Sequence, residues 1–393
     1  MISFDEALAI VGNAAQPLGT ETVPLRDAAG GVLASAVVAA IDSPRADVSA
    51  MDGYAVREAD LASLPVRLRV IGESFPGNAW QGTVATGSCV RIFTGAPVPA
   101  GADRIIIQEL VSRDGDVARI DSRPTDATWI RQRGADFCAG DTLLNGSRCI
   151  DAAALVAIAG ADVADVEVAQ RPRIALLATG DELVDPGQAG QSDLNVPDSV
   201  SPALVAFVAQ WGGAIVMQRR LRDDLTSMTD AAAEAVKAAD LVVVTGGASV
   251  GERDFARAMF EPLELLFSKV AIRPGKPAWF GRAGKTLVLG LPGNPTSAMI
   301  TARLLLAPLL ASMQGRAVDD ALPWEPARLA TGVPACDGRE TFHRAMLSAG
   351  EATVLPFQES HAQKTLADAQ VLVRQAAGSP ALAAGETVQA LRL

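Results

Sequence analysis

The chain is poor in histidine, cysteine and tyrosine. Its 393 residues include only His343 and His361, which argues against a zinc centre or a His-based catalytic triad. Four cysteines lie far apart with no C-x-x-C pair, which indicates reduced structural thiols in the cytoplasm: Cys89, Cys138, Cys149 and Cys336. Any metal is therefore expected to be a hard cation held by carboxylates.

A broad basic surface and a long apolar segment are missing as well. The net charge of -11 argues against a nucleic-acid surface, and 4% aromatic residues leave few rings for base stacking. Asp5 and Glu6 take the place of a basic leader, so a secretory signal is not expected. Residues 152–161 and 304–313 are too short or too interrupted to span a bilayer, so we expect no membrane partner.

The hydrophobic content of 49% suffices for packed cores in about two to four domains. Ser3-Phe4-Asp5-Glu6 matches a capping box that opens a helix, and a second helix is expected over residues 25–37. From residue 41 to about 121, short strands separated by Pro, Gly and Asp predict a β-rich insertion. Helical character resumes at residues 150–159 with Asp151 near the start, so a helical unit is interrupted by a β module.

From residue 173 onward, strands and helices alternate. Strands are expected at residues 173–178, 214–219, 241–244, 263–270 and 286–289, and helices at 201–212, 225–239 and 295–313. Ser201 is expected to cap the first of these helices and Gly212 to end it. Such apolar strands predict a parallel three-layer α/β domain, followed from residue 328 by a small β domain.

Glycine-rich turns lie between Thr245 and Pro295. They are TGGASVGERD (residues 245–254), RPGKP (273–277) and GLPGNP (290–295), and two of them follow apolar strands. An anion site at a sheet edge is predicted by the backbone amides near Gly246 and Gly247, the hydroxyl of Ser249 and a helix start at Asn294 and Pro295. A tight turn and an ordinary helix start would explain the same residues.

Charged residues surround these turns. Lys269, Arg273 and Lys276 predict oxyanion binding, although a solvated face is the usual fate of such clusters. Glu182, Asp223 and Asp254 follow three strands on one side of the sheet, where they are either helix caps or the carboxylates of a Mg²⁺ site beside phosphates. In contrast, nothing in the composition of the turns MDGYA (51–55) and FTGAPVPAGAD (93–103) indicates a function.

Eight motifs in register give the chain a family resemblance. MDGYA, FTGAPVPAGAD, RQRGADFCAGDTLL, ATGDEL, RDD, GGASVGERD, RPGKP and GLPGNP resemble the molybdopterin molybdenumtransferase (MoeA) family, which includes gephyrin. The resemblance implies a multidomain α/β and β fold: a three-layer α/β molybdopterin-binding domain, a β-rich insertion module, a helical or extended dimerisation domain and a C-terminal β-barrel. The corresponding domains are residues 1–41 with 122–170 (dimerisation), 42–121 (insertion), 171–316 (α/β) and 317–393 (barrel).

The implied reaction is Mg²⁺-dependent insertion of molybdate into adenylylated molybdopterin with release of AMP, in a cleft between the subunits of a homodimer. Further partners suggested by the resemblance are the molybdopterin adenylyltransferase and molybdoenzyme chaperones. Matching positions assign metal or catalytic roles to Glu182, Asp223 and Asp254, and catalytic roles to Lys269 and Lys276. Matching positions also line the cleft: Asp52, Thr94, Gly246, Gly247, Ser249, Arg273, Pro292, Asn294, Pro295, Arg344 and Ser360.

Three positions depart from the family pattern. Val200 stands where relatives usually have Asn, Arg273 where many have Lys, and Lys364-Thr365 where Ser-Ser is common. The first departure bears on nucleotide or pterin contacts. Two other functions fit the residues: a nucleotide pyrophosphate hydrolase that ignores molybdate, and a non-catalytic, gephyrin-like scaffold that binds a partner.

Overall fold

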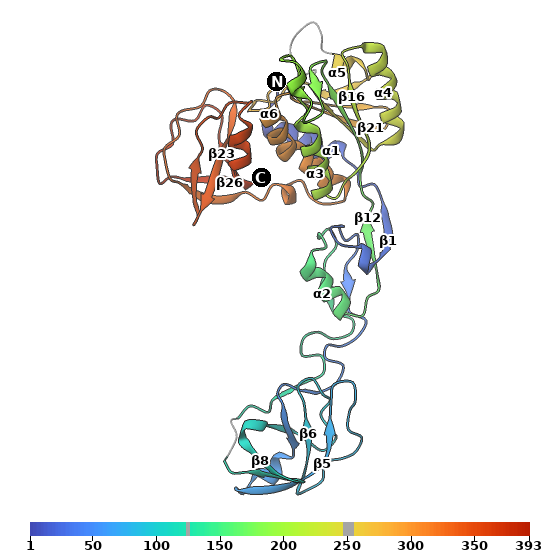
Figure 1. The fold of residues 1–393 in the computed structure, drawn as a ribbon, viewed down its shortest axis with the longest axis vertical. Coiled ribbons are helices and arrows are strands. Elements are labelled where there is room, and N and C mark those ends of the chain that lie inside the picture. Colours follow the sequence, from blue (N-terminus) through green and yellow to red (C-terminus); the bar gives the residue numbers. More distant parts are fainter. Residues whose placement is uncertain (123–125, 247–254) are drawn as a thin grey trace.

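The chain is elongated. The computed structural model describes residues 1–122, 126–246 and 255–393. An α/β body and a C-terminal β-barrel lie at one end, a narrow waist carries α2, β1 and β12, and a β-rich domain forms the other end (Figure 1). The chain passes through the waist twice, because the β-rich domain is inserted into the helical unit as the sequence pattern predicted.

The α/β body is built on a six-stranded sheet. Its strands, in spatial order, are β16 (Ala214–Leu221), β13 (Arg173–Thr179), β17 (Leu241–Thr245), β21 (Thr286–Leu291), β20 (Trp279–Ala283) and β18 (Glu264–Phe267). The first four are parallel to one another, whereas β20 runs antiparallel to β21 and β18 runs antiparallel to β20. The expectation of a parallel sheet is therefore confirmed for these four strands and wrong for the antiparallel edge. Strand β20 was not predicted, because Gly281 and Arg282 break its apolar pattern.

Alternate residues of the central strands pack on opposite faces of the sheet. Ile174 and Leu176 join the larger core, whereas Ala175 and Leu177 join the smaller one. The larger core is covered by α1 (Phe4–Ala14), α3 (Val200–Gln210), α6 (Pro295–Thr301) and α7 (Ala307–Met313), and the smaller by α4 (Leu225–Ala238) and α5 (Phe255–Ala258). Strands that are buried on both faces give the near-continuous apolar runs seen in the sequence. The body thus has three layers.

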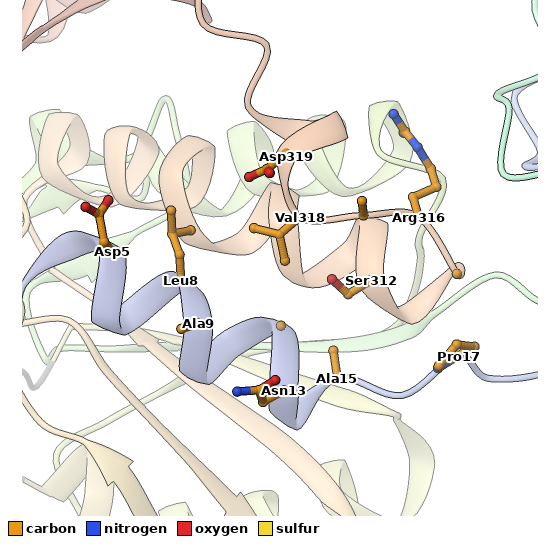
Figure 2. Close-up of a pocket in the computed structure, with 13 residues that line it drawn as sticks. Asp5, Leu8, Ala9, Asn13, Ala15, Pro17, Ser312, Arg316, Val318 and Asp319 are labelled. Carbon is orange, nitrogen blue, oxygen red and sulfur yellow. The ribbon is translucent and has the colours of Figure 1, made fainter.

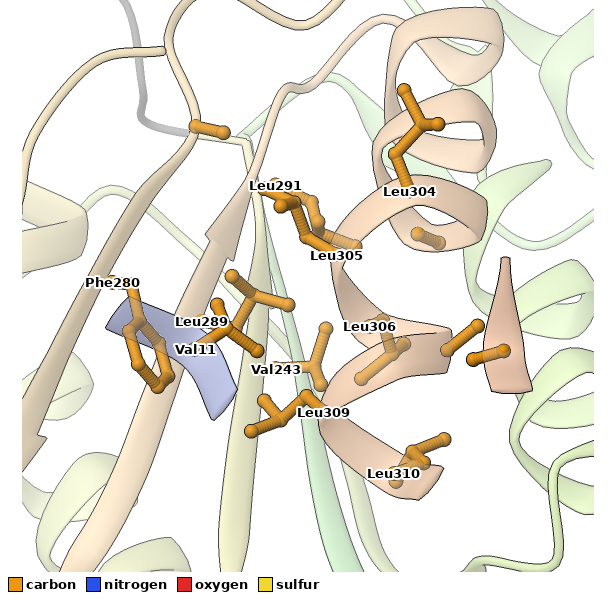
Figure 3. Packing of buried hydrophobic residues seen from close by; sticks show 14 of the residues in the cluster. Val11, Val243, Phe280, Leu289, Leu291, Leu304, Leu305, Leu306, Leu309 and Leu310 are labelled. Atoms are coloured by element: carbon orange, nitrogen blue, oxygen red, sulfur yellow. The ribbon is translucent and has the colours of Figure 1, made fainter. Parts of the chain in front are cut away.

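Helices α6 and α7 are continuous through a π-helical turn, Ala302–Leu306. Leu305 lies toward Leu291, and Leu309 toward Leu289 and Val243, in the larger core (Figure 3). Residues 304–313 form the second half of a 19-residue helical stretch, Pro295–Met313, whose mean hydropathy of 1.4 would allow a membrane span by length and composition alone. Because 94% of it is buried inside the protein, it is a core helix.

Two of the predicted helix starts are confirmed and one is wrong. Ser3 Oγ accepts from the Glu6 amide at 3.1 Å while Glu6 Oε2 accepts from the Ser3 amide at 2.7 Å, which is a capping box. Asp151 caps α2 (Ala152–Gly160). Helix α3 begins before Ser201, whose amide instead donates to Asp198 Oδ1 at 3.0 Å. The Asp198 carboxylate thus accepts the kind of hydrogen bond expected of a cap, although Ser199 holds the N-cap position.

The waist is more extended than expected. The predicted helix over residues 25–37 is replaced by a short 3₁₀ turn (Leu25–Asp27) and β2 (Val37–Val38), because Gly30-Gly31 interrupts the helical pattern. β1 (Thr20–Pro24) pairs with β12 (Asp165–Ala169), and β2 with β11 (Thr142–Leu144). Helix α1 does not join this waist, since it packs on the α/β body, although residues 1–41 were assigned to the dimerisation domain.

The inserted domain is β-rich as expected. Its sheet has the order β7 (Arg104–Ile107), β4 (Gly53–Val56), β6 (Ser88–Ile92), β5 (Val66–Ser74), β9 (Val117–Ile120) and β8 (Val111–Asp114). A small pair, β3 (Val48–Ser49) with β10 (Ile130–Arg131), joins it to the waist.

The C-terminal domain is a closed barrel. Its strands are β22 (Glu325–Leu329), β23 (Glu340–Ser348), β24 (Glu351–Val354), β25 (Val371–Gln375) and β26 (Thr387–Arg392), and the β23–β25 pairing closes it. β19 (Ile272–Arg273) extends from the α/β body and pairs with β23, which joins the two domains. A helix, α8 (Gln363–Asp368), was not expected here.

A groove of about 630 Å³ lies between α1 and the end of α7 (Figure 2). Leu8, Asn13, Val318 and Asp319 are among its lining residues. It lies at the far end of the long helix from the strand-end loops, so the site described next is elsewhere.

Candidate functional site

A cleft of about 600 Å³ opens where the four parallel strands end. The register places Thr179 opposite Leu221, and Thr245 opposite Leu291, so the loops that follow these residues leave the sheet along one edge. Ligands of open α/β sheets bind at this edge. Its lining includes predicted residues from all four loops: Glu182, Asp223, Gly246, Pro292, Asn294 and Pro295.

Gly246 lines the cleft in a conformation that favours glycine. Its φ is +88°, and a Cβ at this position would lie 2.3 Å from the carbonyl oxygen of Thr179. The ends of β13 and β17 therefore lie so close together that only glycine fits at position 246. The predicted residues Gly247, Ser249 and Asp254 lie outside the described residues.

The carboxylates at the strand ends have separate roles. The Glu182 carboxylate lies against Gly180, where a Cβ would be 2.7 Å from Oε2. Asp223 lines the same cleft, and Asp181 Oδ1 accepts from the Asp223 amide at 3.1 Å. Its neighbour Asp224 caps α4 by accepting a hydrogen bond from the Ser227 amide, and this hydrogen bond lowers the pKa of the Asp224 carboxyl. Adjacent acids thus divide into one that faces the cleft and one that begins a helix.

The start of α6 is shared with the barrel. Asn294 occupies the N-cap position but forms no side-chain cap; its Nδ2 instead donates to Ser360 Oγ at 3.1 Å. Pro295 follows at the first helical turn, and both residues line the cleft. The first-turn amides therefore remain available to an anion. The predicted residues Asn294, Pro295 and Ser360 are brought together by this contact.

The three cations lie around the RPGKP turn. Arg273 is exposed on β19 and lines a separate hollow of about 340 Å³ between the body and the barrel. Lys276 is exposed and directly precedes Pro277, which lines the cleft. Lys269 is half-buried, and its carbonyl accepts from the Ile2 amide at 3.1 Å. The expected oxyanion-binding roles of these cations stay predictions.

Arg344 differs from the expected cleft-facing residue. It has 0% exposure, and its guanidinium donates to the carbonyl oxygens of Glu359 at 3.1 Å, Ala362 at 3.4 Å and Phe357 at 3.4 Å. A buried cation needs such acceptors to offset lost hydration. Arg344 therefore holds the loop that carries Ser360, and its position does not support direct oxyanion binding.

Asp52 and Thr94 lie in the inserted domain, at the opposite end of the molecule from the cleft (Figure 1). Asp52 Oδ1 accepts from the Thr94 amide at 2.7 Å and from the Thr94 hydroxyl at 2.8 Å. These two hydrogen bonds, the amide first, lower the pKa of the Asp52 carboxyl. Within one chain, the predicted site residues of the inserted domain therefore lie far from those of the cleft in the α/β body.

We expect Thr94→Val to raise the pKa of Asp52 towards its ordinary value, because the variant keeps the amide donor but loses the hydroxyl. In the native protein this contact stabilises the fold above the ordinary pKa of aspartate, and the contribution is lost as the pH falls through the lowered pKa. A carbon-13 NMR titration of the carboxyl measures the shift. Thr94→Ser keeps the hydroxyl and should leave the titration unchanged; an equal pKa in all three proteins contradicts the assignment.

Several residues of the cleft were not among the predicted site residues. Asp198 and Ser199 line it beside β14 (Leu183–Val184) and β15 (Val196–Pro197), and Ser199 Oγ is buried without a hydrogen-bond partner. Val200, the departure from the family pattern, also lines the cleft. The Asp-Ser pair before a helix was the available signal, but it also fits an ordinary helix start.

The donor set fits Mg²⁺ better than a transition metal. Among the described residues, no group of three or more His, Cys, Asp or Glu side chains gathers as a ready-made metal site. Two carboxylates, Glu182 and Asp223, line one cleft. Mg²⁺ commonly uses one or two carboxylates and takes its other ligands from water and substrate phosphates.

Three family models match the chain in order. The MoeA N-terminal region (domain I and II) matches residues 2–161, a probable molybdopterin binding domain matches residues 175–312, and the MoeA C-terminal region (domain IV) matches residues 326–393.

Individual proteins show the same similarity. The molybdopterin molybdenumtransferase of Haemophilus influenzae is 34% identical over 95% of this chain and 93% of its own. Molybdopterin molybdenumtransferase 2 of Mycobacterium tuberculosis H37Rv is 33% identical over 99% of each chain. A crystal structure of the molybdopterin biosynthesis moeA protein from Pyrococcus horikoshii OT3 has a TM-score of 0.85 and 27% identity, with both chains fully covered.

These matches confirm the resemblance and the multidomain fold class inferred from the eight motifs. They cover the inserted domain, the α/β body and the barrel alike. The chain belongs to the MoeA family of molybdopterin molybdenumtransferases, which are transferases of molybdenum-cofactor biosynthesis.

Proposed function

We propose that the protein inserts molybdate into adenylylated molybdopterin and releases AMP in a Mg²⁺-dependent reaction. The observation that carries this proposal is the single cleft that combines Glu182 and Asp223 with the start of α6. Carboxylates suit a hard cation, while helix N-terminal amides suit phosphate oxygens. Both are needed for a phosphoanhydride that is cleaved beside a metal.

Glu182 and Asp223 would hold Mg²⁺, with Asp254 as a further candidate outside the described residues. When bound, the cation would supply charge neutralisation on the phosphoanhydride oxygens. The cleft residues bind and orient the substrate: the first turn of α6 meets phosphate, and Gly246 permits a close approach of the backbone. Lys276 and Ser249 remain candidates for molybdate. Catalysis then depends on positioning and charge stabilisation.

We propose further that the active protein is a homodimer, with the partner subunit's Asp52 and Thr94 forming the second wall of the cleft. Support comes from the elongated shape, which keeps the inserted domain away from the cleft of its own chain (Figure 1). A partner that lies antiparallel could bring the two together. The cytoplasm as location, and the adenylyltransferase and molybdoenzyme chaperones as partners, remain expectations from the resemblance.

The test is an AMP-release assay with adenylylated molybdopterin, Mg²⁺ and molybdate. We expect AMP release that requires all three, measured by chromatography, together with formation of molybdenum cofactor that activates an apo-molybdoenzyme. Intact adenylylated substrate after prolonged incubation contradicts the proposal. Release without molybdate favours the nucleotide pyrophosphate hydrolase, and tight binding without turnover favours the non-catalytic scaffold.

A further inference from the structure

Four aromatic and cationic groups form a column in the inserted domain. The guanidinium of Arg91 lies 5.1 Å from the ring centroid of Tyr54 and 4.7 Å from that of Phe93. Phe93 in turn stacks on Phe75, with centroids 4.5 Å apart and an interplanar angle of 12°. The column begins at a tyrosine that is only 5% exposed and ends at Phe75, which is 38% exposed.

The buried end of the column is fixed by hydrogen bonds. Arg91 Nη1 donates to the Gly53 carbonyl at 2.9 Å, and Nη2 donates to Gln108 Oε1 at 2.6 Å. Both ends of the guanidinium fork are thereby held, so the plane over Phe93 is set before any ligand arrives. Prior ordering of this kind lowers the entropy cost of binding.

The exposed end is held by a tight turn. Phe75 and Asn78 exchange two backbone hydrogen bonds of 3.0 Å. The indole of Trp80 packs over Gly72 and Gly82, where a Cβ would lie 2.1 Å and 2.5 Å from ring atoms. The turn therefore holds Phe75 in an exposed position.

The column adjoins the Asp52–Thr94 contact. Phe93 directly precedes Thr94, and the Phe93 amide donates to the Ser74 carbonyl at 3.3 Å, which ties the two turns together. Among the described residues, Phe75 and Phe357 are the exposed large aromatic side chains, so an exposed ring beside a predicted cleft position is a rare feature of this chain.

We propose that the exposed ring of Phe75 stacks on a planar heterocycle of the substrate, the pterin or the adenine, bound in the cleft of the partner subunit. This inference rests on the proposed function. A fused nitrogen heterocycle presents a flat face that can stack on the phenyl ring, and removing the ring abolishes this contact. Phe75 is then a specificity-determining residue, with Phe93 and Arg91 as its support.

The experiment measures binding of two probes, AMP and molybdopterin, to the full-length protein by titration calorimetry. Phe75→Leu keeps apolar volume but removes the ring, and we expect about tenfold weaker binding of whichever probe carries the stacked heterocycle. Phe75→Trp should restore the affinity. Val117→Ala is the matched control, because Val117 is 37% exposed on the same sheet; it should leave both affinities unchanged.

The two proposals fail in different ways. If Phe75→Leu binds both probes within twofold of the native protein, the stacking proposal is wrong, whatever the AMP-release assay shows. If the native protein binds a probe through Phe75 but never releases AMP, stacking stands and the proposed reaction fails. Equal thermal unfolding midpoints for Phe75→Leu, Phe75→Trp and Val117→Ala establish that the affinities report on binding.

Discussion

Replacing Asp223 with asparagine is expected to slow AMP release by about 100-fold, the usual cost of removing one charge-stabilising group from an active site. Asp223 lines the cleft together with Glu182, and its backbone amide donates a hydrogen bond to Asp181 Oδ1 at 3.1 Å. The substitution keeps the size of the side chain but removes the charge that would hold Mg²⁺. The apparent Mg²⁺ requirement should therefore rise while kcat falls, both measured in the AMP-release assay.

The adjacent residue provides the control. Asp224→Asn removes the same charge one position further along, but Asp224 accepts from the Ser227 amide at 2.9 Å to cap α4. Asparagine caps helices about as well as aspartate, so we expect little change in stability. AMP release should remain near the native rate. Equal losses in both variants would show that general charge, rather than the cleft-facing position, is what matters.

The α/β body was the most predictable part of the chain, because its strands are buried on both faces. Ile174, Ala175, Leu176 and Leu177 are all apolar for this reason, and the glycine-rich turns mark where the strands end. The site at this edge could thus be located from the sequence. Strand β20, which runs antiparallel between β21 and β18, could not, since Gly281 and Arg282 interrupt its apolar run.

Other features depend on contacts between distant segments, which local patterns do not contain. Ser201 and Asp198 both suit a helix start, and only the backbone path decides that the carboxylate accepts the hydrogen bond. Asparagine is likewise a common helix cap, yet the side chain of Asn294 donates instead to Ser360, 66 residues away in the chain. An arginine on a β-strand does not reveal whether it faces a ligand or three carbonyls of its own chain.

Replacing Arg344 with methionine is expected to destabilise the fold by about 3 kcal/mol or more. Its guanidinium is fully buried and donates to the carbonyls of Phe357, Glu359 and Ala362. Hydrogen bonds from a charged donor each contribute about 1.5–3 kcal/mol, and the abandoned carbonyls would remain desolvated. Denaturant unfolding measures the loss. Arg339→Met is the control, since Arg339 pairs with Asp337 at 2.8 Å near the surface and should cost at most about 1 kcal/mol.

The same variant separates two roles of Arg344 in the reaction. As the residue that holds the Phe357–Ala362 loop, it positions Ser360 and, through the 3.1 Å contact, Asn294 at the start of α6. Its loss should then reduce kcat for AMP release and lower stability together. Arg344→Lys should not rescue either property, because one ammonium cannot reach three carbonyls in a fixed fork. If Arg344 instead binds molybdate directly, the KM for molybdate rises in Arg344→Met while the unfolding free energy stays native, and lysine restores most of the affinity.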